Sequence, residues 1–320
     1  MRRQGNLIIV SNNKDLKTET KAHIAVLSTN VFFAINFSLV KYISPAFIKP
    51  YAVNILRVGI SLILFWLLWT MSNIHPRIKR KHWPRFFLCG LTGIAVNQMF
   101  FIKGLTFTTA IHASLLILLT PILITVFAFT VLKEKVTIAK AFGLALGIGG
   151  AVLLILSKEQ SASASNYLLG DLLIVINAIS YTIYFIIVKP LMAEYPPLHV
   201  VRWVFTFGFF MILPFGWNEF FSIQWGSLEW THYISVAFIV IAGTFLAYFF
   251  NIYGIQHLGA GTTGAYIYTQ PVFAAIIATI VFHERLTVPK LIAAIMIFLG
   301  VFLVSFKRGS FNKSLGVIEE

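Results

Sequence analysis

The chain alternates between long apolar runs and short polar connections. Each of ten runs is long enough to cross a bilayer core of roughly 30 Å as a helix, which takes about 20 residues. The runs lie near residues 23–42, 51–72, 84–103, 107–131, 138–156, 168–188, 198–217, 231–254, 261–282 and 288–306. Barrel strands would alternate over segments of about ten residues, whereas these runs are apolar on every face. Because a helix satisfies its own backbone groups in lipid, the pattern predicts ten transmembrane helices.

Composition supports this prediction. Hydrophobic residues make up 58% of the 320 residues and charged residues 11%, and the mean hydropathy is +0.84. Soluble domains do not reach such values, so we expect an integral membrane protein with the lipid bilayer as its solvent. The first 22 residues are basic, and no small-residue cleavage site follows the first apolar run, so we expect no cleaved signal peptide.

The chain also matches itself at an offset of 150 positions without a gap. The matched pairs are Gly104 with Gly254, Ala110 with Ala260, Pro121 with Pro271, Ala128 with Ala278, Glu134 with Glu284, Thr137 with Thr287, Lys140 with Lys290, Gly150 with Gly300 and Leu153 with Leu303. Weaker matches with small changes of offset relate Ile35, Phe37, Val40, Lys41 and Arg57 to Ile183, Phe185, Val188, Lys189 and Arg202. Paired repeats in an apolar chain are typical of transporters whose halves enclose a site near the bilayer midplane.

The repeat divides the chain into two five-helix units. We expect them at residues 23–156 and 168–306, joined by a Ser- and Ala-rich linker at 157–167 and flanked by tails at 1–22 and 307–320. Because five is odd, the second unit starts on the opposite side of the membrane from the first. The predicted fold is therefore an all-α integral membrane protein, with ten transmembrane helices arranged as two antiparallel (inverted-topology) five-helix repeats.

The basic residues set the expected orientation. The formal net charge is +14, and most of the 25 Lys and Arg residues fall on one side when the amino terminus is placed inside. Positively charged loops stay in the cytoplasm, so both termini are predicted to be cytoplasmic, in a bacterial inner membrane. The charge thus reflects topology and contact with anionic lipid, and we expect no nucleic-acid partner.

Two segments carry a resemblance to a known family. Residues 104–137 read GLTFTTAIHASLLILLTPILITVFAFTVLKEKVT, and residues 254–287 read GIQHLGAGTTGAYIYTQPVFAAIIATIVFHERLT. Both resemble the signature segments of EamA-type transporters of the drug/metabolite transporter superfamily. The resemblance implies a ten-helix inverted-repeat fold and alternating access. It also implies a central cavity lined mainly by the third, fourth, eighth and ninth helices, with help from the first and sixth. Relatives move amino acids, other small metabolites or sugar-linked nucleotides.

Polar and aromatic residues spaced three, four or seven apart share a helix face, and polar faces should turn away from lipid. The residues predicted to line the cavity and bind substrate are Asn36, Asn97, Gln98, Phe101, Tyr181, Tyr184, Tyr248, Asn251, Tyr266 and Gln270. Two alternatives stay open. The tyrosines can belong to an interfacial belt, and the amides can join helices by hydrogen bonds worth on the order of 1 kcal/mol each.

Six further residues are candidates for gating or structural roles. Pro121 and Pro271 each remove a helical hydrogen bond, which predicts either a kink alone or a kink that serves as a hinge. Arg57 and Arg202 can snorkel toward the interface or clamp a substrate carboxylate as a pair of gates. We expect Glu134 and Glu284 to be structural, pairing locally or capping the next helix, rather than to couple protons.

Other chemistry has no visible basis in the sequence. No acidic residue lies at the centre of a span, which disfavours carboxylate-based proton antiport and leaves uniport or exchange. We expect His112 to be a packed or interfacial residue, with a titrating gate as the alternative. Cys89 is the single cysteine and fits no metal or redox pattern. We therefore expect no metal, no cofactor and no enzymatic activity.

The prediction that results is a secondary transporter of a small-molecule substrate. An amino acid or a similar zwitterionic or amphipathic compound is preferred, with export as the direction that the resemblance implies. The alternatives are a non-transporting membrane enzyme or sensor subunit on the same fold, or a carrier of anionic nucleotide-sugars or phosphorylated metabolites. The small-residue ladder Gly143, Gly147 and Gly150 allows close packing within a monomer or across a homodimer.

Overall fold

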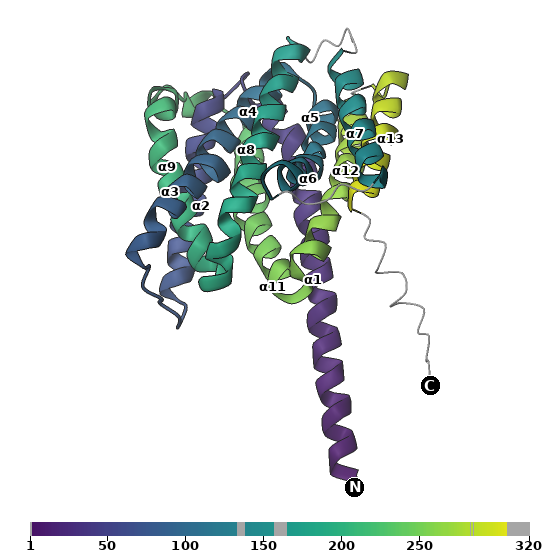
Figure 1. The fold of residues 1–320 in the computed structure, drawn as a ribbon. Helices are drawn as coiled ribbons and strands as arrows, with labels where there is room; N and C mark the ends of the chain where they lie inside the picture. Colours follow the sequence, from purple (N-terminus) through teal and green to yellow (C-terminus); the bar gives the residue numbers. More distant parts are fainter. Residues whose placement is uncertain (1, 133–137, 157–164, 282, 284, 306–320) are drawn as a thin grey trace.

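The computed structural model describes residues 2–132, 138–156, 165–281, 283 and 285–305, and helices make up its regular structure (Figure 1). The first half contains α1 (Arg2–Ile43), α2 (Pro50–Thr70), η1 (Arg80–His82), α3 (Trp83–Gly90), η2 (Leu91–Val96), α4 (Asn97–Phe107), α5 (Ala110–Ile117), α6 (Leu119–Leu132) and α7 (Ile138–Leu156). The second half contains α8 (Tyr167–Glu194), α9 (Pro197–Phe221), η3 (Trp225–Ser227), α10 (Trp230–Val240), η4 (Ile241–Leu246), α11 (Ala247–Ala265), η5 (Tyr266–Thr269), α12 (Gln270–Val281) and α13 (Val288–Ser305).

Six helical stretches among the described residues are long and apolar enough to cross a membrane. They are Thr18–Ile43, Pro50–Thr70, Arg80–Phe107, Tyr167–Glu194, Pro197–Phe221 and Trp230–Leu258. Four shorter apolar helices occupy Ala110–Ile124, Ala141–Leu156, Tyr266–Val281 and Val288–Leu303. The chain is thus an all-helical protein built largely of apolar helices, as a multi-pass membrane protein requires.

Local sequence accounts for several helix starts. Pro50 and Pro197 stand in the first turns of α2 and α9, where a missing N–H costs nothing. Thr109 and Asn166 precede α5 and α8, and their side chains accept hydrogen bonds from the backbone N–H groups of the first turn. These caps mark where α5 and α8 begin.

Two predicted boundaries differ from the structure. Helix α1 begins at Arg2, well before the predicted residue 23, and projects beyond the bundle (Figure 1). No proline interrupts residues 2–22, so nothing in the local sequence stops a helix there. The gap between the predicted spans 231–254 and 261–282 also differs from the structure, because α11 continues to Ala265 and is followed by the 3₁₀ turn η5.

Two helices each contain a π-helical turn at the same place in the repeat. The turn η2, at residues 91–96, joins α3 to α4, and the turn η4, at residues 241–246, joins α10 to α11. Their positions differ by the same 150 residues that relate the two repeats. Such turns inside α-helices often accompany functional sites. The two turns lie next to the cavity described below.

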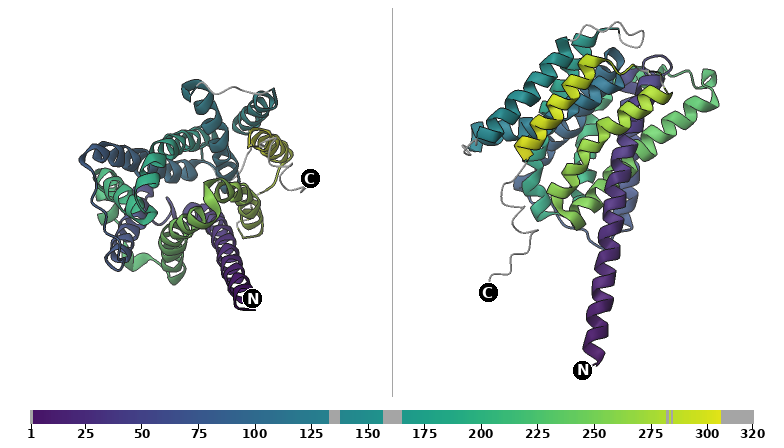
Figure 2. Two further views of the ribbon diagram at one scale, coloured as in Figure 1. Left: turned by 60° about the horizontal axis from the view of Figure 1, so that its bottom comes forward. Right: turned by 90° about the vertical axis from the view of Figure 1, so that its right-hand side faces the viewer.

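The helices pack in pairs that follow the repeat. Helix α2 packs against α9, and α7 packs against α13. The contact between α4 and α8 corresponds, in the repeat, to the contact between α11 and α1. Figure 2 shows α7 and α13 side by side at the edge of the bundle. The glycine ladder of α7 contacts α13 of the same chain, since a Cβ built on Gly300 would lie 2.5 Å from the backbone nitrogen of Gly147. The ladder therefore serves packing within the bundle.

Candidate functional site

A cavity of about 170 Å³ lies inside the bundle. Both halves of the chain line it, through α1, α2, α4, α5, α6, α8, α11, η5 and α12. Its described lining residues on α1 run from Val26 to Phe37, and those on α8 run from Asn177 to Phe185. These stretches lie near the middle of the membrane-length segments Thr18–Ile43 and Tyr167–Glu194, so the cavity lies at mid-depth in the bundle. Helix α1 projects from one end of the bundle (Figure 1). We name this the lower end, and the opposite one, where α5 and α8 begin, the upper end.

The structure brings eight of the ten predicted binding residues to this cavity. They are Asn36, Asn97, Gln98, Phe101, Tyr181, Tyr248, Asn251 and Gln270. Tyr184 and Tyr266 do not line it. Tyr184 is 9% exposed and packs against the π-turn, where a Cβ built on Gly93 would lie 2.4 Å from its ring. Tyr266 instead forms a 2.8 Å hydrogen bond between its hydroxyl and Nδ1 of His23.

Amide side chains of α4 and α8 hold one wall of the cavity together. Asn97 and Asn177 exchange hydrogen bonds, each amide nitrogen donating to the other residue's backbone oxygen at 3.3 and 2.8 Å. Gln98 donates from Nε2 to Oδ1 of Asn97 at 3.2 Å and to the hydroxyl of Tyr248 at 3.3 Å. The amides thus join helices and line the cavity at once, and the two predicted alternatives for them do not exclude each other.

The opposite wall joins α1 to α12. Nε2 of Gln270 donates to Oδ1 of Asn30 at 2.8 Å, and both side chains are buried. The sequence analysis missed Asn30, although it is an amide inside a span with Phe33 and Phe37 on the same helix face. Thr120 and Thr263 also line the cavity and were missed; they lie near Pro121 and Pro271 in the signature segments.

Asn36 lies where α1 crosses the second π-turn. A Cβ built on Gly243 would lie 2.7 Å from Oδ1 of Asn36, so only glycine allows this approach. In the other half, Gly93 makes the equivalent approach to Tyr184. The π-turn of each half therefore places a glycine against a polar side chain from the first helix of the other half: η4 meets α1, and η2 meets α8.

Arg57 is the one charged side chain among the described lining residues. It is 2% exposed, and its Nε donates to Oγ1 of Thr244 in the π-turn η4 at 3.0 Å. Its Cζ lies 6.0 Å from the ring centroid of Phe101. Snorkelling would bring the guanidinium to water, so the burial of Arg57 differs from that expectation.

Arg202 is equally buried, at 2% exposure, but does not line the cavity. Its Cζ lies 4.3 Å from the ring centroid of Trp66 and 3.7 Å from that of Trp69. Its Nη2 lies 2.9 Å from Nδ1 of His199. Stacked indole rings stabilise a desolvated guanidinium by cation–π attraction, and they surround Arg202 although its Nε and Nη1 have no hydrogen-bond partner among the described residues.

The two prolines follow breaks in their helices. Pro121 is the third residue of α6, after Leu118 separates α5 from α6, and Pro271 is the second residue of α12, after the 3₁₀ turn. Each break lies beside the cavity lining, so a hinge at these positions would reshape the cavity. Glu134 and Glu284 lie outside the residues that the structure describes.

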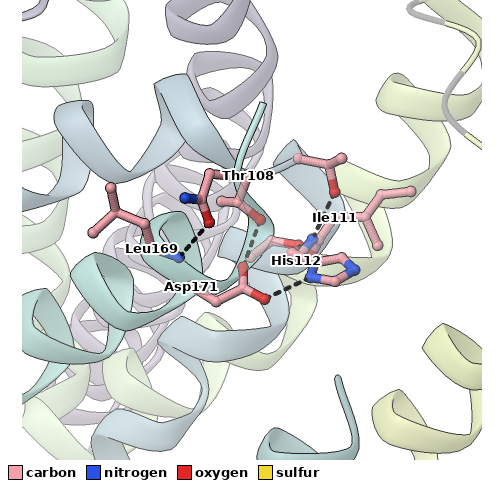
Figure 3. A network of polar contacts seen from close by, with 8 residues as sticks. Thr108, Ile111, His112, Leu169 and Asp171 are labelled. Atoms are coloured by element: carbon pink, nitrogen blue, oxygen red, sulfur yellow. Dashed lines mark hydrogen bonds and ion pairs between the residues drawn. The ribbon is translucent and has the colours of Figure 1, made fainter. Parts of the chain in front are cut away.

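A second polar cluster lies at the upper end (Figure 3). His112 of α5 and Asp171 of α8 point toward each other, with Nδ1 of His112 2.9 Å from Oδ2 of the carboxylate. The hydroxyl of Thr108 donates to Oδ1 of Asp171 at 2.5 Å, and all three residues are 0% exposed. The sequence analysis predicted a packed or interfacial role for His112, with a titrating gate as the alternative. The pairing was missed because the two partners stand 59 positions apart.

The site offers binding groups rather than reactive ones. Among the described residues, no group of three or more His, Cys, Asp or Glu side chains could hold a metal ion. Cys89 is free and buried in a hydrophobic cluster away from the cavity. Amide and aromatic side chains with one guanidinium are suited to reversible recognition of a small polar molecule.

Comparisons with known proteins agree on one family. Residues 20–156 and 168–306 each match the EamA-like transporter family. An uncharacterized transporter of Archaeoglobus fulgidus is 26% identical over 90% of this chain and 100% of its own length. The uncharacterized transporter YetK of Bacillus subtilis is 25% identical over 78% of this chain and 76% of its own. The WAT1-related protein At3g53210 of Arabidopsis thaliana is 24% identical over 92% of this chain and 88% of its own.

A solved crystal structure shares the fold. It covers 89% of this chain and 97% of its own with a TM-score of 0.60, at 16% sequence identity. At that identity the likeness concerns the path of the backbone and not the chemistry of the cavity.

Proposed function

The chain belongs to the EamA-like transporter family, and from that membership we propose that it is a secondary transporter that carries a small metabolite through the central cavity by alternating access. The observation that carries this proposal is the cavity of about 170 Å³, lined by polar and aromatic side chains from both halves of the chain. A site shared between two repeats can be exposed to either side when one repeat rocks against the other. The family and its named relatives support a multi-pass membrane transporter.

We further propose ten membrane spans in two inverted repeats. The π-turns at residues 91–96 and 241–246 support this arrangement, because they repeat at the sequence offset. The mirrored packing of α4 with α8 and of α11 with α1 supports it as well. In this proposal the amino terminus, and with it the lower end, is cytoplasmic in a bacterial inner membrane.

The polar contacts at the two ends suggest which side the cavity faces in this structure. The upper end holds the fully buried Thr108, His112 and Asp171, whereas the contact of His23 with Tyr266 at the lower end is only partly buried. This supports a state whose site faces the cytoplasm and whose upper end is closed. Transport would then require the buried polar cluster to open and the lower end to close.

The lining favours a small zwitterionic or amphipathic substrate, with an amino acid as the first candidate and export as the proposed direction. An apolar cavity of about 150 Å³ holds benzene, so a cavity of about 170 Å³ suits a compound that has only a few more non-hydrogen atoms than benzene. A nucleotide-sugar is several times larger and carries several negative charges, whereas the described lining carries one cation.

Counterflow in proteoliposomes tests the proposal. Vesicles are loaded with one of the twenty common amino acids, and entry of a labelled trace of the same compound is followed against empty liposomes. We expect counterflow for one chemical group and its loss in Gln270→Ala, because Gln270 lines the cavity. Silence for amino acids and for a second panel of small metabolites, with protein shown to be folded and inserted, would refute a transport function.

A further inference from the structure

The buried guanidinium in the cavity has no counter-ion among the residues that the structure describes. No Asp or Glu stands among the described lining residues, so the charge of Arg57 has no acidic partner there. Its Nε donates a hydrogen bond to the hydroxyl oxygen of Thr244. That hydroxyl donates its own proton to the backbone oxygen of Ile239 at 2.8 Å, so it acts only as an acceptor toward Arg57. This hydrogen bond fixes the orientation of the guanidinium.

One end of that guanidinium remains unused. Nη1 of Arg57 is buried and has no hydrogen-bond partner among the described residues. A buried charge without a partner is strongly unfavourable. The stacked indoles that surround Arg202 have no equivalent here, since the Phe101 ring lies at the 6.0 Å limit of a cation–π contact. An anion with a planar pair of oxygens would satisfy this group.

Among the described lining residues, Oδ1 of Asn36, Oγ1 of Thr263 and Oε1 of Gln98 are buried without a hydrogen-bond partner, and Gln98 stands on α4, which packs against α2. Nε2 of Gln98 is occupied by Asn97 and Tyr248. The backbone oxygen of Gln98 accepts from Asn54, which stands one helical turn before Arg57 on α2. The cavity therefore offers an unpaired cation and an unpaired carbonyl from two adjacent helices.

From these two groups we infer that Arg57 binds the carboxylate of a small α-amino acid or a similar zwitterion, and that the side-chain carbonyl of Gln98 accepts its ammonium group. This inference rests on the proposed function, since it assigns the substrate of the same cavity. The charge count selects a single carboxylate, because a second anionic group would meet no further cation among the described lining residues. We therefore expect a phosphate ester or a dicarboxylate to bind more weakly than a monocarboxylate.

The first test varies the compound and leaves the protein unchanged. Purified full-length protein is screened with the twenty common amino acids for stabilisation against thermal unfolding. Each amino acid that stabilises is then compared with its carboxamide, which keeps the ammonium and the side chain but carries no negative charge. We expect the carboxamide to bind at least about tenfold more weakly, because a charge-assisted hydrogen bond is lost. Equal affinity for the two compounds would overturn the inference.

The second test varies the arginine. Arg57→Gln should weaken amino acid binding at least about tenfold, and Arg57→Lys should restore part of it, because the charge returns without the planar fork. Arg202→Gln is the matched control, since it removes an equally buried arginine that does not line the cavity; it should leave affinity unchanged. Unchanged affinity in folded Arg57→Gln would refute the role of Arg57.

The third test concerns the ammonium group. Gln98→Met should weaken binding of the amino acid but not of the corresponding acid that lacks the amino group, because only the former uses the Gln98 carbonyl. An equal loss for both compounds would contradict the assignment of Gln98.

Failure of this inference can be told apart from failure of the proposed function. If no amino acid stabilises the protein, or if phosphorylated compounds do so instead, the inference is wrong, whereas counterflow of any other metabolite still supports transport. If no compound shows counterflow, the transport function fails, whatever the binding assays show.

Discussion

The two ends of the bundle are held by polar contacts of different kinds. At the upper end, Asp171 of α8 bonds His112 and Thr108, and all three are fully buried. At the lower end, His23 of α1, which occupies the position of Asp171 in the other half, bonds the hydroxyl of Tyr266 in a partly buried contact. The equivalent positions Asp171 and His23 thus both form polar contacts, with His112 in α5 and Tyr266 in η5, but only the upper contact includes a carboxylate removed from water.

The difference between the ends indicates how a repeat becomes asymmetric. A polar pair in a dry environment contributes more than the same pair in water, and it costs more to leave unpaired. The polar contact at the upper end should therefore stabilise the structure more than the one at the lower end. Four predictions test that comparison, in order of decreasing expected effect.

Removing the carboxylate should have the largest effect. Asp171→Ala breaks a buried pair and leaves His112 and Thr108 without their shared acceptor, which should lower the free energy of unfolding by about 3 to 5 kcal/mol. Thermal or denaturant unfolding in detergent measures the loss. His23→Ala at the equivalent position is the control and should cost much less. Equal losses in the two variants would show that the ends do not differ.

The tight backbone approach at the upper end should come next. A Cβ on Gly170 would lie 2.6 Å from the backbone nitrogen of Thr108 and 2.9 Å from the backbone oxygen of Gly104. Gly170→Ala should therefore cost roughly 1 to 3 kcal/mol, because backbone neighbours cannot move aside. The equivalent position on α1 already holds the buried Ala22. Gly226→Ala is the control, since nothing lies within 4 Å of its Cβ; similar stability of both variants would contradict the argument.

The polar contact at the lower end should matter less. Tyr266→Phe removes one partly buried neutral hydrogen bond to His23, worth about 0.5 to 1.5 kcal/mol. Because Tyr266 does not line the cavity, we expect substrate affinity to change little, whereas Gln270→Ala should reduce it. Binding titrations of both variants decide the matter. A larger loss of affinity in Tyr266→Phe would place Tyr266 among the binding residues after all.

The ion pair of Lys79 with Glu194 should have the smallest effect. Lys79 lies outside the spans, with 63% of its side chain exposed, and its hydrogen bond to Glu194 raises its pKa above the ordinary lysine value. A raised folded-state pKa favours the folded protein at every pH below the ordinary value and loses its effect only as the pH rises through the folded-state pKa. Lys79→Ala should therefore leave the melting temperature unchanged at neutral pH, since solvent screens the pair. A clear drop at neutral pH would show a stronger contact.

The pattern along the chain was enough to predict its class. Runs of about 20 apolar residues have few structural solutions in lipid, so helices could be predicted without tertiary information. The match of Pro121 with Pro271, and of the residues around them, identified the family. Helical spacing also pointed to the polar faces of α4, α8 and α11, because polar groups inside apolar helices avoid lipid.

Tertiary structure alone decided how those polar groups were used. The sequence treated Arg57 and Arg202 as equivalents, yet one lies in the cavity beside Thr244 and the other among indole rings. It likewise could not pair His112 with Asp171, because helix periodicity relates residues within one element and carries no information about which elements meet. Apolar patterning determines that a chain enters the membrane as helices, whereas hydrogen bonds, buried charge and close glycine contacts depend on which helices become neighbours.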